Sequence, residues 1–329
     1  MKTSKIILFA VIFSLFLMSS IALSQDNSST LYVDDDGTQD YASIQDAIEN
    51  ASDGDTVFVY NGIYEEGSFL INKSINLIGE NKENTIIQGS STQDQSYIVN
   101  IISDDVALSG FTIRNSTLLE ILPSIPEDDN PIDIKINVGD GVRISSDNIT
   151  IFGNIIKDNG GDGIVLYSGQ NTTIVANILS NNSQAIYLKY CSSNLVVNNS
   201  IEDNKLGIVF LNDSYDNIFY HNNFINSSLY HASDNGKNIF YSEELKQGNY
   251  WDEYKGTDKN NDGIGDTAYN VSSTTQDKYP LMNPYIGRIV IKDFYVDEFS
   301  VQLMLVVGMI ATIIFCVPIG LWWRKKYFK

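Results

Sequence analysis

A run of oxygen-bearing residues near the end of the chain has the spacing of a calcium-binding loop. Calcium prefers about six to eight oxygen ligands, and acidic or amide side chains at alternate loop positions turn toward one centre. Gly263 would supply the sharp turn, whereas Tyr269 stands where a helix–loop–helix calcium site has its bidentate glutamate. The alternative is an Asp/Asn/Gly turn that needs no metal. The candidate calcium ligands, with one backbone carbonyl from isoleucine, are Asp258, Asn260, Asp262, Ile264 and Asp266.

Paired carboxylates indicate a second kind of chemistry. When the strands of the type Gly-Ile-x-Leu are aligned, Asp140 and Asp162 take equivalent positions, and Arg143 and Lys189 fall on the same outward face. Two carboxylates beside a cation or base could act on a glycosidic bond, or could bind calcium together with a uronate. The alternative is ordinary turn chemistry, because aspartate before glycine is common in turns. These residues are the candidates for a polysaccharide-active lyase, hydrolase or epimerase.

Tyrosines on the same face point to binding without catalysis. Tyr167 and Tyr187 fall on that face in successive units, and sugar rings stack on exposed aromatic planes. We favour carbohydrate binding, or a structural role in the cell envelope, over an enzyme. The expected partner is therefore a polysaccharide or an envelope glycan. A formal net charge of −20 argues against nucleic acid as a partner, since the phosphate backbone attracts cationic surfaces.

The element that must position these residues is a repeat. Motifs that begin with asparagine recur at Asn148, Asn171, Asn194, Asn217 and Asn238, in steps of 23, 23, 23 and 21 residues. Each unit contains three short runs rich in Ile, Val, Phe and Tyr, which alternate with period two and are separated by polar turns. This pattern predicts an all-β solenoid with three strands per coil, in which coils pair about 4.8 Å apart. The equivalent asparagines are expected to stack and to hydrogen-bond along a ladder.

Apolar runs near both ends of the sequence predict export and anchoring. A positive start, an apolar core and a small-residue cleavage site before Gln25 predict a signal peptide. Val301–Trp323 has 23 residues without charge, and basic residues follow it directly, which predicts a membrane span with a cytoplasmic tail. The ectodomain is then expected outside the cell membrane. The expected segments are a signal peptide (1–24), an N-terminal segment with a capping helix (25–53), β-helix repeats (54–247), a closing segment with the calcium-type loop (248–285), a juxtamembrane linker (286–300), one transmembrane helix (301–323) and a tail (324–329).

Cysteine use and glycosylation motifs fit an exported chain without disulfides. Cys191 lies in the repeats and Cys316 lies in the predicted membrane span, so the two are not expected to pair. Motifs of the form Asn-x-Ser/Thr are dense along the ectodomain. Glycans are expected on a subset of them, because some of these asparagines are assigned to the ladder.

Three parts of the sequence resemble a known class of proteins. They are DYASIQDAIENASDGDTVFVYNGIYEE (40–66), the asparagine-led repeats, and GNYWDEYKGTDKNNDGIGDTAY (248–269) with DKYPLM (277–282). Together they resemble the N-terminal segment, the coils and the closing segment of right-handed parallel β-helix proteins of the NosD-like, pectate-lyase-like class, especially archaeal cell-surface forms. The resemblance covers roughly residues 31–285. It implies the fold, whereas the class includes lyases, hydrolases, epimerases and binding proteins.

The NosD resemblance also implies an association with copper delivery. Copper sites in proteins are built from histidine, cysteine and methionine. The chain has only His221 and His231, and no cluster of methionines accompanies them. Copper binding is therefore not the favoured interpretation.

Overall fold

The computed structural model describes residues 28–89, 96–116, 119–122, 134–137, 139–211, 213–234, 238–286, 290–291 and 294–295. The predicted signal peptide (1–24), membrane span (301–323) and tail (324–329) lie outside these residues, as does most of the linker (286–300). Within the described part, no helix combines the length and the apolar character that crossing a membrane requires.

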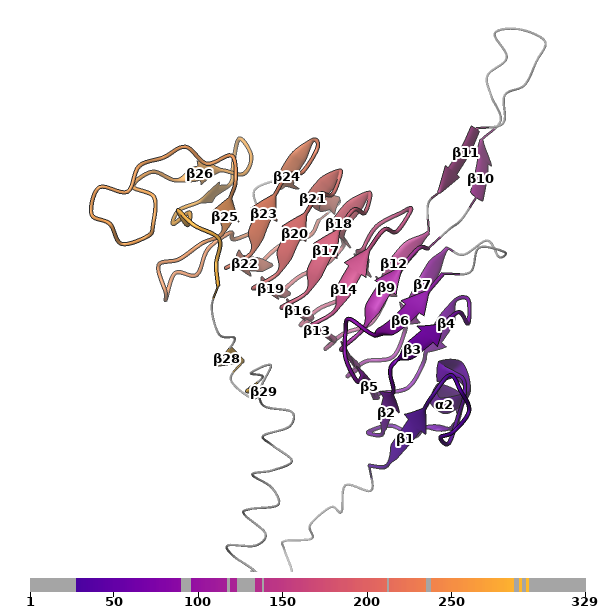
Figure 1. Ribbon diagram of the computed structural model, residues 1–329. Helices are drawn as coiled ribbons and strands as arrows, with labels where there is room; N and C mark the ends of the chain where they lie inside the picture. Colours follow the sequence, from indigo (N-terminus) through magenta and orange to yellow (C-terminus); the bar gives the residue numbers. More distant parts are fainter. Residues whose placement is uncertain are drawn as a thin grey trace, which may run out of the picture.

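The chain winds into a right-handed parallel β-solenoid, as predicted, with three strands in each coil (Figure 1). Successive strands join sheets A, B and C in turn. Sheet A contains β1 (Thr30–Val33), β2 (Thr56–Val59), β5 (Asn76–Gly79), β8 (Ala107–Ser109), β13 (Thr150–Phe152), β16 (Thr173–Val175), β19 (Leu195–Val197) and β22 (Ile218–Tyr220). Sheet B contains β3 (Gly62–Tyr64), β6 (Thr85–Gln88), β9 (Thr112–Arg114), β14 (Ile155–Lys157), β17 (Ile178–Ser180), β20 (Ser200–Glu202), β23 (Asn223–Ile225) and β25 (Tyr250–Trp251). Sheet C contains β4 (Phe69–Ile71), β7 (Tyr97–Ile101), β12 (Asp140–Ile144), β15 (Ile164–Tyr167), β18 (Gln184–Lys189), β21 (Leu206–Leu211) and β24 (Tyr230–Ser233).

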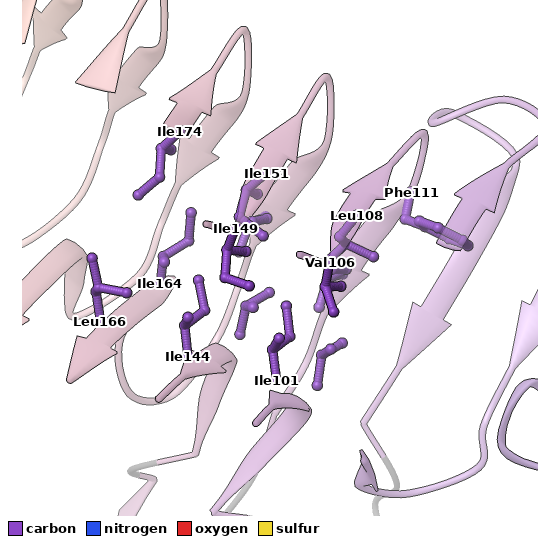
Figure 2. Packing of buried hydrophobic residues seen from close by; sticks show 14 of the residues in the cluster. Ile101, Val106, Leu108, Phe111, Ile144, Ile149, Ile151, Ile164, Leu166 and Ile174 are labelled. Carbon is purple, nitrogen blue, oxygen red and sulfur yellow. The ribbon is translucent and has the colours of Figure 1, made fainter. Parts of the chain in front are cut away.

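Apolar side chains fill the inside of the coils in continuous columns. Ile101, Ile144, Leu166 and Leu188 are register partners in successive strands of sheet C, and each is fully buried. Figure 2 shows Ile144 of sheet C and Ile151 of sheet A pointing into the same interior space. Because alternate residues of a strand face opposite sides, the residues between these columns point away from this interior. One core therefore runs the length of the stack.

A buried asparagine ladder runs along the corner between sheets A and B. In each coil, the backbone N–H of one asparagine donates to the side-chain oxygen of the asparagine in the next coil, as from Asn177 to Asn199 at 2.9 Å. The side-chain amide donates to the same oxygen and to a carbonyl of an earlier coil. Each buried amide thus has its partners, as buried polar groups require. The members of this ladder are Asn154, Asn177, Asn199, Asn222 and Asn249. A second ladder, at the corner between sheets B and C, contains Asn159, Asn182 and Asn204.

The ladder at the corner between sheets C and A corrects the predicted register. It runs from Asn194 to Asn238, and the residue below Asn194 is Thr172, whose N–H donates to the asparagine at 2.8 Å. Asn148 and Asn171 lie one position earlier, exposed and at φ +60° and +54°. Each corner needs a residue in the left-handed region, which asparagine tolerates better than most residues. Asparagine therefore occurs both at the buried ladder position and at the exposed left-handed position one residue earlier. The spacing of the motifs does not tell these two positions apart.

A helix covers the N-terminal end of the stack, as predicted. Helix α2 (Ile44–Asn50) buries Ile44, Ala47 and Ile48 against the first coil. The side chain of Ser43 caps its first turn, and the carboxylate of Glu66 accepts the N–H of Ile44 at 2.5 Å. These contacts close the end where a strand would otherwise expose unpaired groups.

The closing segment covers the other end and belongs to the stack. β25 pairs with β23, so the last strand of sheet B lies beyond the boundary predicted at residue 247. Two buried aspartates receive the ends of two ladders, namely Asp277 in the closing segment and Asp234 directly after β24 (Tyr230–Ser233). Asn249 donates its N–H to Asp277 at 2.7 Å, and the amide of Asn238 donates to Asp234 at 2.6 Å. The remaining strands form short antiparallel pairs, namely β10 (Leu119–Leu122) with β11 (Ile134–Asn137), β26 (Tyr269–Asn270) with β27 (Gln276–Asp277), and β28 (Val290–Ile291) with β29 (Phe294–Tyr295).

The pair β10–β11 forms an arm between β9 and β12. It projects away from the coils, directly before the strand that begins at Asp140 (Figure 1). The solenoid resumes its register after this arm, because Asp140 pairs with Tyr97 of the preceding coil.

Candidate functional site

The predicted acid pair lies on the edge of sheet C where β12 and β15 begin. One carboxylate oxygen of Asp140 accepts the backbone N–H of Asp162 at 3.1 Å, and the other accepts the guanidinium of Arg143 at 2.7 Å. The amide of Gln184, one coil further, donates to Asp162 at 3.1 Å. The structure therefore brings Asp140, Asp162 and Arg143 together in adjacent coils, as predicted.

Burial sets the protonation of this pair. Burial, and to a smaller extent the nearby carboxylate of Asp140, raise the pKa of Asp162 to about 7. Burial also raises the pKa of Asp140, while the hydrogen bond from Arg143 opposes this rise. Because Arg143 stabilises the anion of Asp140, Asp162 is the member that holds a proton near neutral pH. A carboxyl group that exchanges a proton near pH 7 has the basic property of a general acid.

Access to the pair is narrow. Asp140 is only 6% exposed, and both of its oxygens accept hydrogen bonds from the protein. The guanidinium of Arg143 lies over the ring of Tyr97, 5.1 Å from its centre. Sequence reasoning did not identify Tyr97, because the coils before the arm depart from the repeat pattern. Gln184 could have been found, since it precedes Ala185 as Asp162 precedes Gly163.

Lys189 belongs to a second cluster on sheet C, which we call the tyrosine–lysine patch (Tyr167, Lys189 and Tyr190). The register places Lys189 directly beside Tyr167. Its ammonium lies 5.3 Å from the ring centre of Tyr167 and 5.4 Å from that of Tyr190. Within the described residues it forms no ion pair with Asp140 or Asp162, so the predicted grouping of Lys189 with the acid pair is not found.

The patch presents two aromatic rings to solvent. Tyr167 is 43% exposed and Tyr190 is 45% exposed, with ring centres 5.7 Å apart and planes at 90°. Tyr190 was missed because it lies outside the strand, at φ +59°, where tyrosine is unusual. Tyr187 is only partly exposed and takes the position of Val165 and Arg143 in earlier coils, as predicted.

The calcium-type loop folds around its own side-chain oxygens. Asp258 accepts the N–H groups of Asp262 at 3.2 Å and of Gly263 at 2.9 Å. Asn260 also accepts the N–H of Asp262, and Asp262 in turn accepts that of Ile264 at 2.9 Å. Each of these side chains therefore accepts a hydrogen bond from the backbone of the loop itself.

Asp266 lies across the base of this loop. Its carboxylate accepts the N–H of Lys259 and the hydroxyl of Thr257, each at 3.1 Å. Within the described residues, no three side chains among His, Cys, Asp and Glu gather in an arrangement that could hold a metal ion. Calcium binding by this loop stays a prediction.

The two histidines are buried and serve different contacts. His221 hydrogen-bonds Gln247 at 2.7 Å, its ring stacks on Tyr285, and burial lowers its pKa. His231 hydrogen-bonds Ser227 at 3.0 Å through one ring nitrogen, and Asp252 at 2.8 Å through the other. Both rings thus tie coil residues to each other or to the closing segment.

The family of the chain follows from its sequence. The model of the family described as "Periplasmic copper-binding protein (NosD)" matches residues 48–256, well over half of the chain. The chain belongs to the NosD family. This confirms the NosD-like resemblance seen in the sequence, and the matched range covers the coils from α2 to the start of the closing segment. Among curated proteins, no match to this NosD-family chain is found.

Solved structures match the chain only at low sequence identity. A pectin methylesterase in complex with a hexasaccharide is 13% identical, with a TM-score of 0.41, over 62% of this chain and 80% of that one. Pectin methylesterase PemA from Erwinia chrysanthemi is 12% identical, with a TM-score of 0.43, over 70% and 72%. A GH136 lacto-N-biosidase from Eubacterium ramulus is 13% identical, with a TM-score of 0.45, over 68% and 56%. Similarity at this level carries no information about substrate.

The description of the NosD family raises the question whether this member can hold copper. Copper would need imidazole, thiolate or thioether ligands that converge on one point. His221 and His231 are each engaged by protein groups, and the buried thiol of Cys191 donates to the carbonyl of Leu166 at 3.1 Å. Burial raises the pKa of that thiol, which disfavours the thiolate that binds metal. The described residues of this NosD-family chain do not fit a copper site.

Proposed function

We propose that this NosD-family chain is a membrane-anchored extracellular protein that binds a polysaccharide or cell-envelope glycan through the tyrosine–lysine patch. The observation that carries the proposal is the exposed pair of rings of Tyr167 and Tyr190, with the ammonium of Lys189 beside both. Exposed aromatic rings with a polar neighbour are common at binding surfaces, because one part of the site is apolar and another forms hydrogen bonds.

The scaffold favours recognition of an extended glycan. The patch lies on a sheet whose strands are held by backbone pairing on both sides and by a continuous core beneath. The backbone that carries Tyr167 and Lys189 is therefore fixed before the ligand arrives, which limits the entropy lost on binding. The ammonium of Lys189 can donate to sugar hydroxyl or carboxylate groups, while the rings contact the C–H faces of the sugar.

Anchoring and calcium binding belong to the same proposal. The signal-peptide pattern (1–24) and the apolar run (301–323) support a single-pass protein with its coils outside the cell. Calcium in the loop from Asp258 to Asp266 would stiffen the closing segment, from which the chain continues toward the predicted anchor. An envelope protein of this type presents a rigid binding surface close to the membrane.

A glycan array tests the binding proposal. The full chain in detergent is screened for bound polysaccharide, and the hits are titrated with variants. Tyr167→Ala and Tyr190→Ala are each expected to weaken binding by about tenfold, which corresponds to roughly 1.4 kcal/mol. Tyr32→Ala is the matched control, because Tyr32 is 39% exposed but lies on sheet A. Equal affinity of all three variants and the unmodified protein would reject the patch as the site.

A polysaccharide-active enzyme is the second candidate, and the raised pKa of Asp162 favours it. A carboxyl with a pKa of about 7 beside the carboxylate of Asp140 resembles the acid and base pair of glycosidic-bond cleavage. Hits from the array are therefore assayed for new reducing ends and for unsaturated uronates. Turnover that Asp162→Asn abolishes, without loss of binding, would establish catalysis. Binding without turnover would support the first function.

A further inference from the structure

A polar hollow lies where the last coil meets the closing segment, on the side of sheet A. Its volume is ≈ 280 Å³. One wall comes from the segment after β22, where Ile239 forms one more bridge with sheet A at Ile218. The other wall comes from the turn and second strand of the β26–β27 hairpin. We call this hollow the cap pocket, and the lining residues that matter are Ile239, Tyr241, Ser273, Thr274, Gln276 and Lys278.

Both walls of the cap pocket are fixed to one buried carboxylate. The amide of Asn238 donates to Asp234 at 2.6 Å, and the hydroxyl of Thr275 donates to the other oxygen of the same carboxylate. Asn238 is also the last member of its ladder, where it accepts the N–H of Asn217 at 3.1 Å. The hairpin is therefore held against the last coil, and the pocket is formed before any ligand binds.

The lining has the composition of a sugar site. Ile239 is 40% exposed and provides an apolar surface next to the ring of Tyr241. Ser273, Thr274 and Gln276 line the same hollow; the amide of Gln276 also donates to Asn270 at 2.7 Å, and the hydroxyl of Thr274 lies 3.3 Å from that of Ser272. Pockets for larger ligands usually measure about 300–1,000 Å³, so this smaller hollow suits one sugar residue rather than a chain.

A lysine that forms no ion pair within the described residues lies at this pocket. The ammonium of Lys278 is 4.8 Å from the ring centre of Tyr241, and this contact raises its pKa. Within the described residues, no carboxylate forms an ion pair with it, whereas the neighbouring Lys246 pairs with Glu243. The carboxylate of Glu243 also contributes to the raised pKa of Lys278, but it is paired with Lys246. In a chain with a net charge of −20, an ammonium that is not ion-paired, beside a polar hollow, favours an anionic ligand.

We propose that the cap pocket binds a single acidic sugar residue, a uronate, with its carboxylate on Lys278 and its ring against Tyr241. The hydroxyl groups of the sugar would reach Ser273, Thr274 and Gln276. An inorganic anion has no apolar surface and would make no apolar contact with Ile239 or with the ring of Tyr241. This site is separate from the tyrosine–lysine patch and does not depend on it.

Titration of the full chain in detergent with sodium glucuronate, glucose and inorganic phosphate tests the proposal. Glucuronate is expected to bind in a saturable manner, and glucose at least about tenfold more weakly, because it lacks the charge. Lys278→Ala and Tyr241→Ala are each expected to weaken glucuronate binding by about tenfold or more. Lys246→Ala removes the same charge from the neighbouring ion pair and is expected to change the affinity less than about twofold.

Several results would overturn the site. They are equal binding of glucose and glucuronate, phosphate binding that matches glucuronate and is insensitive to Tyr241→Ala, or equal losses in the two lysine variants. A thermal melt of each variant shows that it is folded, and Tyr241→Phe, which keeps the ring, is expected to retain binding. Tyr167→Ala separates the two proposals, since it is expected to weaken polysaccharide binding at the patch by about tenfold but to leave glucuronate binding unchanged.

Discussion

The carboxylate of Asp277 accepts the backbone N–H of Asn249 at 2.7 Å and the indole N–H of Trp251 at 2.9 Å. An asparagine ladder that begins at Asn154 thus ends on a buried acid in the closing segment. Every member of the ladder accepts from the coil before it and donates to the coil after it. The acid supplies the final acceptor that the last asparagine would otherwise lack.

Loss of this terminal acceptor is expected to destabilise the closing end. Asp277→Ala leaves buried N–H groups of Asn249 and Trp251 without partners, which should lower the free energy of unfolding by about 3 kcal/mol. Urea denaturation measures this change. The exposed Glu244 provides the control, since Glu244→Ala should change stability by less than about 0.5 kcal/mol. An Asp277→Ala protein as stable as the control variant would disprove the role of the acid.

Loss of a ladder asparagine in the middle of the stack should destabilise the fold about as much as loss of Asp277. The amide of Asn199 donates to Asn222 at 2.9 Å and to two backbone carbonyls, and its oxygen accepts the N–H of Asn177. Asn199→Ala is expected to cost roughly 2–4 kcal/mol, because it leaves buried groups unpaired in two coils. Asn72→Ala changes an exposed asparagine beyond β4 and should be nearly neutral. Thermal and urea unfolding compare the two, and similar losses would refute the ladder as the cause.

The acid pair predicts a specific pH dependence of stability. The pKa of Asp162 is about 7 in the folded chain and 3.8 in a model compound. Between these values the folded state holds a proton that the unfolded state has released, so the free energy of unfolding falls as pH rises through this window. In the Asp162→Asn variant, the free energy of unfolding should therefore change less between pH 4 and 7. A smaller decrease should remain, because burial raises the pKa of Asp277 to about 6.

Denaturation midpoints at several pH values measure this slope. Asp203→Asn is the control, because Asp203 is exposed and lies on the outside of the stack. If Asp162→Asn and the unmodified chain lose stability in parallel as pH rises, the protonation assigned to Asp162 is wrong.

Calcium should raise the melting temperature if the loop binds it. A ligand that binds only the folded state stabilises it by about 2.7 kcal/mol when its concentration is about one hundred times the dissociation constant. Millimolar calcium is therefore expected to stabilise the chain, and a chelator should reverse the effect. Asp258→Ala and Asp262→Ala should remove the response, because both carboxylates belong to the predicted ligand set. Identical melting curves with calcium and with chelator would exclude the site.

Much of the fold could be predicted because the same sequence pattern recurs in each coil and marks its turns and its strands. The period of the asparagine motifs, the three apolar runs per unit and the capping helix after Ser43 all correspond to observed elements. The register at the corner between sheets C and A could not be predicted. Asn171 and Asn194 have similar surroundings in the sequence, but only the second belongs to the ladder, and the distinction lies in backbone conformation.

The site residues likewise fall into those that the repeat pattern predicts and those that it does not. Asp140 and Asp162 were placed together because their strands carry a recognisable pattern. Lys189 was grouped with them since it shares their sheet, but its position further along the strand brings it to the tyrosine rings instead. The cap pocket could not be predicted, because its lining residues do not belong to the repeat pattern. Lys278 contacts Tyr241 only because the closing segment folds back on the last coil.

The covered ends of the β-solenoid affect whether molecules can assemble end to end. A parallel solenoid grows by about 4.8 Å with each coil, and an open end would pair with another molecule as readily as with its own next coil. Helix α2 blocks one end and the segment held by Asp277 and Asp234 blocks the other. The molecule is thereby protected against fibre growth, and its length is set by its own number of coils.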